Sequence, residues 1–167
     1  MTEIGVIGGD EAADALNEIY EMTGDATVTT QRLDESSVPR RFNVLVINGA
    51  GFIAPKFLKE LEPGDAVVIN TDNKQLYSYL GGCRGRLITY GFSSKACVTA
   101  SSVSGQPLEY VQCIQLCIQR ELPTLSGDPL EPQEFSVTFK SPKNISCALG
   151  AVAAALIAGI PVKSFSE

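Results

Sequence analysis

The feature that most constrains the fold is the passage from an apolar strand into a glycine turn and a helix near the start of the chain. Residues 4–7 form the apolar run, Gly8 and Gly9 follow directly, and a helical pattern starts with Asp10 and Glu11. Many proteins cradle a phosphate with this layout, because the backbone amides at the start of the helix point at the anion. The order of elements predicts an α/β fold.

The charge at this turn opposes phosphate binding. A nucleotide-binding P-loop places a lysine beside the phosphates and a hydroxyl on magnesium, whereas this chain has Asp10 and Glu11 there. Each carboxylate would repel a phosphate by about 1 kcal/mol at contact in water, and by more in a dry site. We also expect Asp10 to cap the helix through its side chain. The sequence thus predicts the architecture of a nucleotide site without its chemistry.

Composition indicates one globular domain over residues 1–167. The chain is 44% hydrophobic and 19% charged, and it is long enough to bury a core without metals or disulfides. Its net charge is −6 and its pI is near 4.7. A nucleic-acid partner needs a basic surface, so we expect none.

The ends of the chain and its cysteines favour a cytosolic protein without a membrane partner. No basic and apolar leader follows Met1, and the apolar run 147–162 is shorter than the roughly 20 residues that cross a bilayer. We expect this run to be a buried helix. The chain has five cysteines and no histidine, which favours reduced thiols and gives no metal site.

Hydrophobic periodicity predicts alternating strands and helices in the first half. A first helix is expected over residues 11–23, ending at Gly24, with its inward stripe at Ala12, Ala15, Leu16, Ile19 and Thr23 and with Asp14, Glu18 and Glu21 in water. Strands are expected at 26–30, 43–48, 66–70 and 86–90, with a polar loop at 31–41. One helix is expected at 54–61, and another is expected to follow a cap at Thr71 and Asp72 and to end near residue 80. This alternation predicts a mostly parallel sheet with right-handed crossovers.

The second half changes to a period of two around turns rich in glycine and proline. Residues 96–103, 108–121 and 133–140 predict an antiparallel meander. A last helix is expected to begin at Ser141 and Pro142 and to run to Gly159.

Several phrases of the chain resemble the Mur ligases, which join amino acids to peptidoglycan precursors using ATP, and their folylpolyglutamate-synthase relatives. The phrases are PGDAVVINTDN (63–73), RLITYGF (86–92), KACVTASSV (95–103) and KNISCALGAVAAALIAGIP (143–161). They are similar to the family's central, ATP-binding domain. The resemblance implies a three-layer sheet of the P-loop NTPase kind, an ATP and magnesium site, and a role in cell-wall precursor metabolism.

Most functional positions of the family are changed in this chain. The P-loop falls on residues 8–12, which keep glycines but have no lysine or hydroxyl, and the magnesium-binding acid falls on Asp34. The segment that brings a histidine toward the second metal falls on 47–53, which has neither acid nor imidazole. In the adenine-facing motif, Lys143 replaces the histidine and Cys147 the second asparagine, so that only Asn144 is kept.

The resemblance therefore implies a vestigial nucleotide cleft at Gly8, Gly9 and Asn144, with no catalytic residue, metal ligand or cofactor. Our leading hypothesis is a binding or regulatory module that has lost catalysis. Its ligand, a protein or a small molecule, would lie in the old cleft near Gly8, Asn48, Asp72 and Asn144.

Two alternatives belong to other classes. The first is one component of a two-chain ATP-dependent ligase, in which a partner supplies the missing cations and ATP and magnesium are bound. The second is an activity with Cys83 as nucleophile, since Arg84 and Arg86 beside it would lower the pKa of its thiol. The absence of histidine as a general base weighs against the second alternative.

Overall fold

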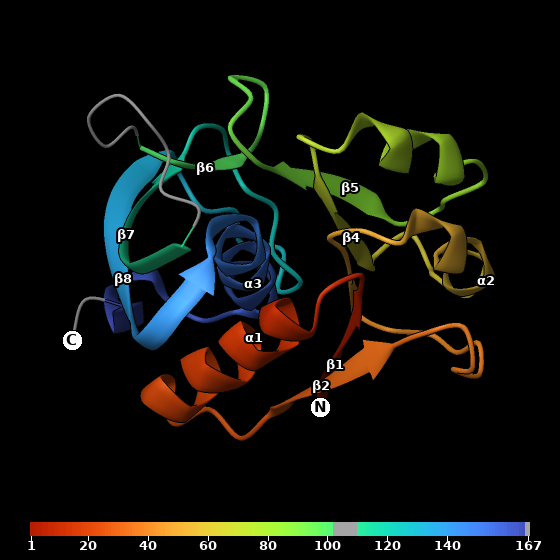
Figure 1. The fold of residues 1–167 in the computed structure, drawn as a ribbon, viewed down its shortest axis with the longest axis horizontal. Coiled ribbons are helices and arrows are strands. Elements are labelled where there is room, and N and C mark those ends of the chain that lie inside the picture. The colour runs from red at the N-terminus through yellow and green to blue at the C-terminus, as the bar shows by residue number, and fades with distance from the viewer. Residues whose placement is uncertain (102–109, 166–167) are drawn as a thin grey trace.

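The computed structural model describes residues 1–101 and 110–165, and within them eight strands form one sheet (Figure 1). The strand order is β2-β1-β3-β4-β5-β6-β7-β8. The strands are β1 (Thr2–Ile7), β2 (Val28–Leu33), β3 (Val44–Ile47), β4 (Ala66–Asn70), β5 (Arg86–Tyr90), β6 (Val98–Ala100), β7 (Tyr110–Ile118) and β8 (Gln133–Asn144). The helices are α1 (Asp10–Thr23), α2 (Pro55–Leu58) and α3 (Ile145–Ala158), with 3-10 turns η1 (Gly51–Ile53), η2 (Lys74–Tyr79) and η3 (Val162–Phe165).

The pairing of the strands confirms a mostly parallel sheet that ends in an antiparallel meander. Strands β2, β1, β3, β4 and β5 all run parallel to their neighbours, and β6 joins β5 in parallel through the pair Tyr90 and Val98. The pairs β6·β7 and β7·β8 are antiparallel. Of the predicted meander, residues 102–103 and 108–109 lie outside the described residues.

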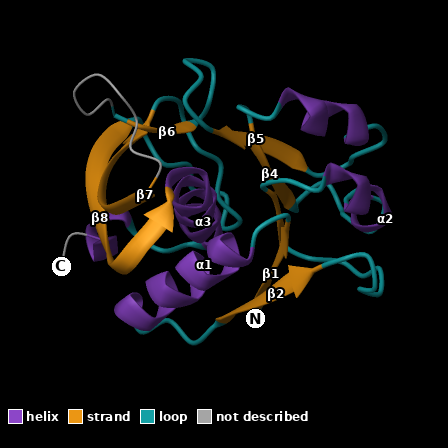
Figure 2. Ribbon diagram, viewed as in Figure 1, coloured by secondary structure: helices purple, strands orange, loops and turns teal. Residues whose placement is uncertain are grey.

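Helices cover both faces of the sheet (Figure 2). Helices α1 and α3 share one core with the inner face of β6, β7 and β8, and α2, η1 and η2 lie on the other side. The curled meander and α1 surround α3, and residues 147–157 are all buried. A helix that is apolar on every side needs such a position. The expected buried helix is confirmed, and none of the described helices is long and apolar enough to cross a membrane.

The first helix packs largely as its pattern predicts. Ala12, Ala15, Leu16 and Ile19 are buried, and the helix ends at Gly24 in the left-handed conformation, with φ at 69°. Thr23 is only half-buried, and its hydroxyl donates to the carbonyl of Ile19 at 3.0 Å.

Two boundaries differ from prediction, and in the first case the reason is that strand pairing outweighs local composition. Strand β2 extends to Leu33, into the expected loop, since it stays in register with β1 from Thr2 and Val28 to Ile7 and Leu33. The predicted helix 54–61 is reduced to the short α2. Its first residue is Pro55, whose fixed φ suits that position.

Two predicted helix starts are wrong. Thr71 and Asp72 do not cap a helix: the Thr71 hydroxyl donates to the Tyr90 carbonyl, and the Asp72 carboxylate accepts the Phe92 amide at 3.1 Å. The segment that follows them is the 3-10 turn η2.

The last helix also begins later than predicted, because Ser141 and Pro142 lie in strand β8. This strand pairs with β7 as far as Asn144 and then continues directly into α3. Proline is tolerated there since β8 is an edge strand.

Candidate functional site

The candidate site lies where the carboxyl ends of β1 and β3 meet. The chain builds the sheet outward in both directions from these two strands, and ligands of open α/β sheets bind outside the strand ends at such a point. Gly8 follows β1, and Asn48 and Gly49 follow β3. The amide of Asn48 donates to the carbonyl of Ile7 at 3.0 Å, which holds the two strand ends together.

Gly8 allows the two backbones to touch at this point. Its φ is +80°, and a Cβ added there would lie 2.2 Å from the carbonyl oxygen of Gly49. Any side chain would therefore meet both backbone strain and a direct clash. Gly8 is therefore needed here for the close contact between the ends of β1 and β3.

The start of α1 differs from the predicted cap. Gly9 occupies the N-cap position with no side-chain hydrogen bond, and Asp10 is the first helical residue, so the predicted cap at Asp10 is wrong. The amides of Ala12 and Ala13 lie 3.2 and 3.4 Å from the Gly9 carbonyl. The exposed Asp10 carboxylate lies 3.9 Å from Nε of Arg32.

Glu11 links the start of α1 to the start of α3. Its carboxylate accepts the backbone amide of Asn144 at 3.2 Å. The side-chain oxygen of Asn144 accepts the amides of Ser146 and Cys147 at 3.0 and 3.4 Å and so caps α3. The structure thus brings Asn144 to the region of Gly8 and Gly9, with its side-chain oxygen engaged as a helix cap.

A chain of polar groups that sequence reasoning missed, with Tyr90 and Cys147 buried and Asn48 half-buried, lies beneath this bend. The Tyr90 hydroxyl donates to Oδ1 of Asn48 at 2.5 Å, and Nδ2 of Asn48 donates to Sγ of Cys147 at 3.4 Å. Gly150 gives the tyrosine its space, because a Cβ there would lie 2.8 Å from the Tyr90 ring. These residues come from β5, the end of β3 and α3, and no sequence spacing relates them.

Burial keeps this chain of groups neutral. Burial, followed by the nearby Glu11 carboxylate, raises the pKa of the Cys147 thiol to about 11, against the opposing hydrogen bonds from the amides of Asn48 and Ala12. The pKa of Tyr90 lies well above its ordinary value, mainly through burial. The thiol is therefore protonated at neutral pH and is no nucleophile.

Lys143, for which the resemblance implies the place of a histidine, lies in a buried ion pair. Its Nζ lies 3.0 Å from Oε2 of Glu18, and both side chains are about nine-tenths buried, so the prediction that Glu18 faces water is wrong. Burial alone would raise the pKa of Glu18, but the Lys140 amide and Lys143 lower it below its ordinary value. The Lys143 ammonium on β8 therefore pairs with the Glu18 carboxylate on α1, which neutralises its charge.

The remaining predicted positions are separate from one another. The exposed Asp34 accepts the amide and hydroxyl of Ser36 in its own turn, and Cys83 is half-buried in the turn after η2. Across residues 1–101 and 110–165, Cys, Asp and Glu side chains form no cluster of three that could hold a metal. With Asp10 and Glu11 at the bend, these residues do not fit ATP with magnesium.

Comparison with solved structures finds Mur ligases. The chain is similar to a murein peptide ligase from Psychrobacter arcticus, with a TM-score of 0.74 and 12% identity over 97% of this chain. Two ligases from Acinetobacter baumannii also match: the UDP-N-acetylmuramoylalanyl-D-glutamyl-2,6-diaminopimelate–D-alanyl-D-alanyl ligase (TM-score 0.63, 13% identity, 100% of this chain) and MurF (0.64, 11%, 99%).

No protein-family model matches the sequence, and neither does any curated protein. The chain spans 45% of the murein peptide ligase and 46% of the other two ligases, less than half of each. The agreement in strands and helices holds across nearly all of this chain. At 11 to 13% identity, the similarity establishes that this chain has a Mur ligase fold.

Proposed function

We propose that this chain is a Mur-ligase-like binding or regulatory module without ligase activity of its own, acting in the cytosol in connection with cell-wall precursor metabolism. The fold supports the connection with Mur ligases. The charge and contacts at the glycine bend support the loss of catalysis. The five unpaired cysteines support a reducing compartment.

One observation carries the proposal, the link between Glu11 and Asn144. A nucleotide at this bend would need a positive charge near its phosphates and a free polar edge for its base. Instead, a carboxylate at the start of α1 accepts the Asn144 amide, and the Asn144 side-chain oxygen caps α3. The Glu11 carboxylate and the Asn144 side-chain oxygen are thus both engaged with backbone amides at the start of α3.

The surface around the same strand ends favours a protein or an uncharged small molecule as the ligand. Phe52, Tyr77 and Phe92 lie on the segments after β3, β4 and β5, and each is 42 to 57% exposed. Aromatic side chains are common anchors of binding surfaces. The acidic bend beside them would repel polyanions.

Titration calorimetry with ATP and magnesium tests the proposal. We expect no saturable heat and no phosphate release above the rate without protein. A thermal melt of the same sample shows that the protein is folded. Binding with a micromolar Kd, or any phosphate release that depends on the protein, would overturn the proposal.

The two-chain ligase remains the second candidate, because the chain corresponds to less than half of each similar ligase. In that case a partner would supply the cations for phosphoryl transfer. Ligase activity that appears only when a co-purifying protein is added would support this candidate. No partner can remove the carboxylates of Asp10 and Glu11, which is why we rank it second.

A further inference from the structure

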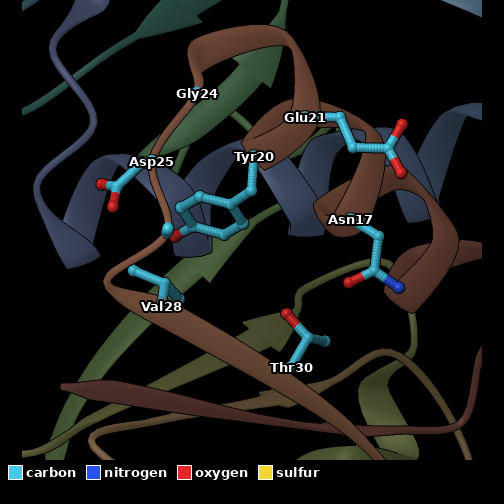
Figure 3. A pocket seen from close by; sticks show the side chains of 8 residues that line it. Asn17, Tyr20, Glu21, Gly24, Asp25, Val28 and Thr30 are labelled. Atoms are coloured by element: carbon cyan, nitrogen blue, oxygen red, sulfur yellow. The ribbon is translucent and has the colours of Figure 1, made fainter.

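A pocket lies at the opposite end of α1 from the glycine bend, between the helix and the strand that follows it. Its volume is about 410 Å³, within the range of small-molecule sites. Figure 3 shows side chains from α1 and from β2 on either side of it. The lining residues are Asn17, Tyr20, Glu21, Gly24, Asp25, Ala26, Val28 and Thr30.

The charge of this pocket is negative. Asp25 accepts the hydroxyl and the amide of Thr27 at 2.6 and 2.8 Å, and these hydrogen bonds lower the pKa of its carboxyl. Glu21 adds a second carboxylate, which lies 3.6 Å from the exposed Lys140 ammonium. The other polar lining groups, the amide of Asn17 and the hydroxyl of Thr30, are neutral. Such a lining favours a cation over an anion.

Tyr20 is the independent sign that something else belongs in the pocket. Its side chain is 8% exposed, and its hydroxyl has no hydrogen-bond partner among the described residues. Figure 3 shows the ring crossing from α1 toward Asp25 and Val28, with its hydroxyl on that side. Buried hydroxyls nearly always have partners, so the missing partner of this one points to a group from outside the described residues. Burial and Asp25 raise the pKa of the phenol, which therefore stays neutral.

We propose that this pocket binds an alkylammonium group, from either a free amine or a lysine side chain. The Asp25 carboxylate balances the charge of the ligand, and the Tyr20 oxygen accepts one of its N–H groups. The Tyr20 ring and Val28 cover its methylene chain. A cation beside a tyrosine ring gains further attraction from the ring.

This site does not depend on the function proposed above. The 14 residues of α1 span about 20 Å, so the pocket and the glycine bend are tested separately. A result that contradicts one of the two proposals leaves the other unaffected.

The experiment is an NMR titration of the ¹⁵N-labelled protein at constant ionic strength. The probes are n-butylammonium chloride and, as the neutral probe of equal size, n-butanol. We expect the ammonium to saturate with a Kd on the order of 1 mM, typical of so few atoms, and to shift the amides of residues 17–30. We expect n-butanol to give no saturable shift. 1,4-Diaminobutane and N-acetyl-lysine amide then distinguish a free diamine from a lysine side chain by which binds more tightly.

Matched variants separate the pocket from general charge attraction. Asp25→Asn keeps the turn acceptors and should weaken binding about tenfold, since it removes the paired charge. Asp34→Asn removes the same charge from an equivalent turn outside the pocket, so binding should stay within about twofold. Tyr20→Phe should weaken binding about threefold, as expected for one hydrogen bond, and Tyr79→Phe, on η2 and outside the pocket, should not change it. No saturable binding, equal losses in the two aspartate variants, or an unaffected Tyr20→Phe would overturn the proposal.

Discussion

The two ends of α1 differ in how far their polar groups are satisfied within the chain. At the amino end, Glu11 holds the Asn144 amide, Asn48 joins Tyr90 to Cys147, and Gly8 touches Gly49. At the carboxyl end, a buried hydroxyl has no partner within residues 1–101 and 110–165, and a carboxylate lines a pocket. The glycine-rich motif of the sequence lies at the amino end of α1, whereas the Tyr20 hydroxyl, which lacks a partner among the described residues, lies near the carboxyl end.

This difference teaches that a glycine-rich turn is weak evidence for a ligand. Gly8 and Gly24 flank the same helix, and both have positive φ. A Cβ at Gly8 would meet Gly49 at 2.2 Å, while a Cβ at Gly24 would meet nothing within 4 Å. Both glycines have structural reasons to be where they are.

The comparison of these two glycines is tested most strongly by alanine. We expect Gly8→Ala to lower the free energy of unfolding by about 4 kcal/mol or to prevent folding, through strain plus a backbone clash. Gly24→Ala should cost only about 1 kcal/mol, because it meets strain alone. Urea denaturation monitored by circular dichroism measures both. Equal losses would mean that the strand ends are not in contact at Gly8.

The next largest effect concerns the two carboxylates on the side of α1 that faces β8. Glu18→Gln should cost about 3 kcal/mol, because it leaves the buried Lys143 without its counter-charge. Glu21→Gln removes an exposed pair with Lys140 and should cost at most about 0.5 kcal/mol. Chemical denaturation of both variants gives these values.

The same pair predicts a dependence on pH. The pKa of Glu18 is lower in the folded protein than its ordinary value of 4.5. Its stabilisation is therefore complete above that value and is lost as the pH falls through the lower, folded pKa. The stability of Glu18→Gln should fall less on acidification than that of the unchanged protein, and a parallel fall would contradict the buried pair.

A third test uses the thiol beneath the glycine bend. The pKa of Cys147 rises from 9.0 to about 11 on folding, so its stabilisation is complete below the unfolded value and is lost as the pH rises through the folded value. The stability advantage of the unchanged protein over Cys147→Ala should shrink by about 2 to 3 kcal/mol over that range. Burial raises the pKa of Tyr20 in both proteins alike, so its contribution cancels, whereas Cys147 is itself one cause of the raised pKa of Tyr90 and adds to the difference between the two proteins. An advantage that does not change with pH would show that the thiol is exposed.

The smallest effect separates two buried tyrosines. Tyr90→Phe should destabilise the protein by about 1 to 3 kcal/mol, since it leaves Oδ1 of Asn48 without its donor. Tyr20→Phe should be neutral or stabilising by about 1 kcal/mol, because its hydroxyl has no partner to lose. Thermal and urea unfolding of the two variants would show the reverse order if the Tyr20 hydroxyl were paired within the chain.

Local patterns were enough to predict much of the fold. The runs at β3 and β4 are short and apolar, and the change to a period of two marks the meander. The start of α3 could not be found in this way, because Ser141 and Pro142 look like a helix start but lie within the edge strand β8, at the irregularity in its pairing with β7. The cap at Asp72 failed for a similar reason, since its carboxylate bonds to Phe92, twenty residues away.

The sites were less predictable than the fold. The acids at the bend can be read directly from residues 10 and 11. The contact of Gly8 with Gly49 and the chain from Tyr90 to Cys147 depend on strand order, which no local pattern contains. The pocket beside Tyr20 requires the packing of α1 against β2 as well.

Asn144 is the last residue of β8 and also the cap of α3, so no loop separates the two elements. The direction of the central helix is therefore set by the register between β7 and β8. A slip of one residue in that pairing would move Asn144, and with it the start of α3, by about 3.3 Å along the strand, and would turn the side chains of β8 to the opposite face. The edge strand β8 therefore determines where the buried helix α3 begins.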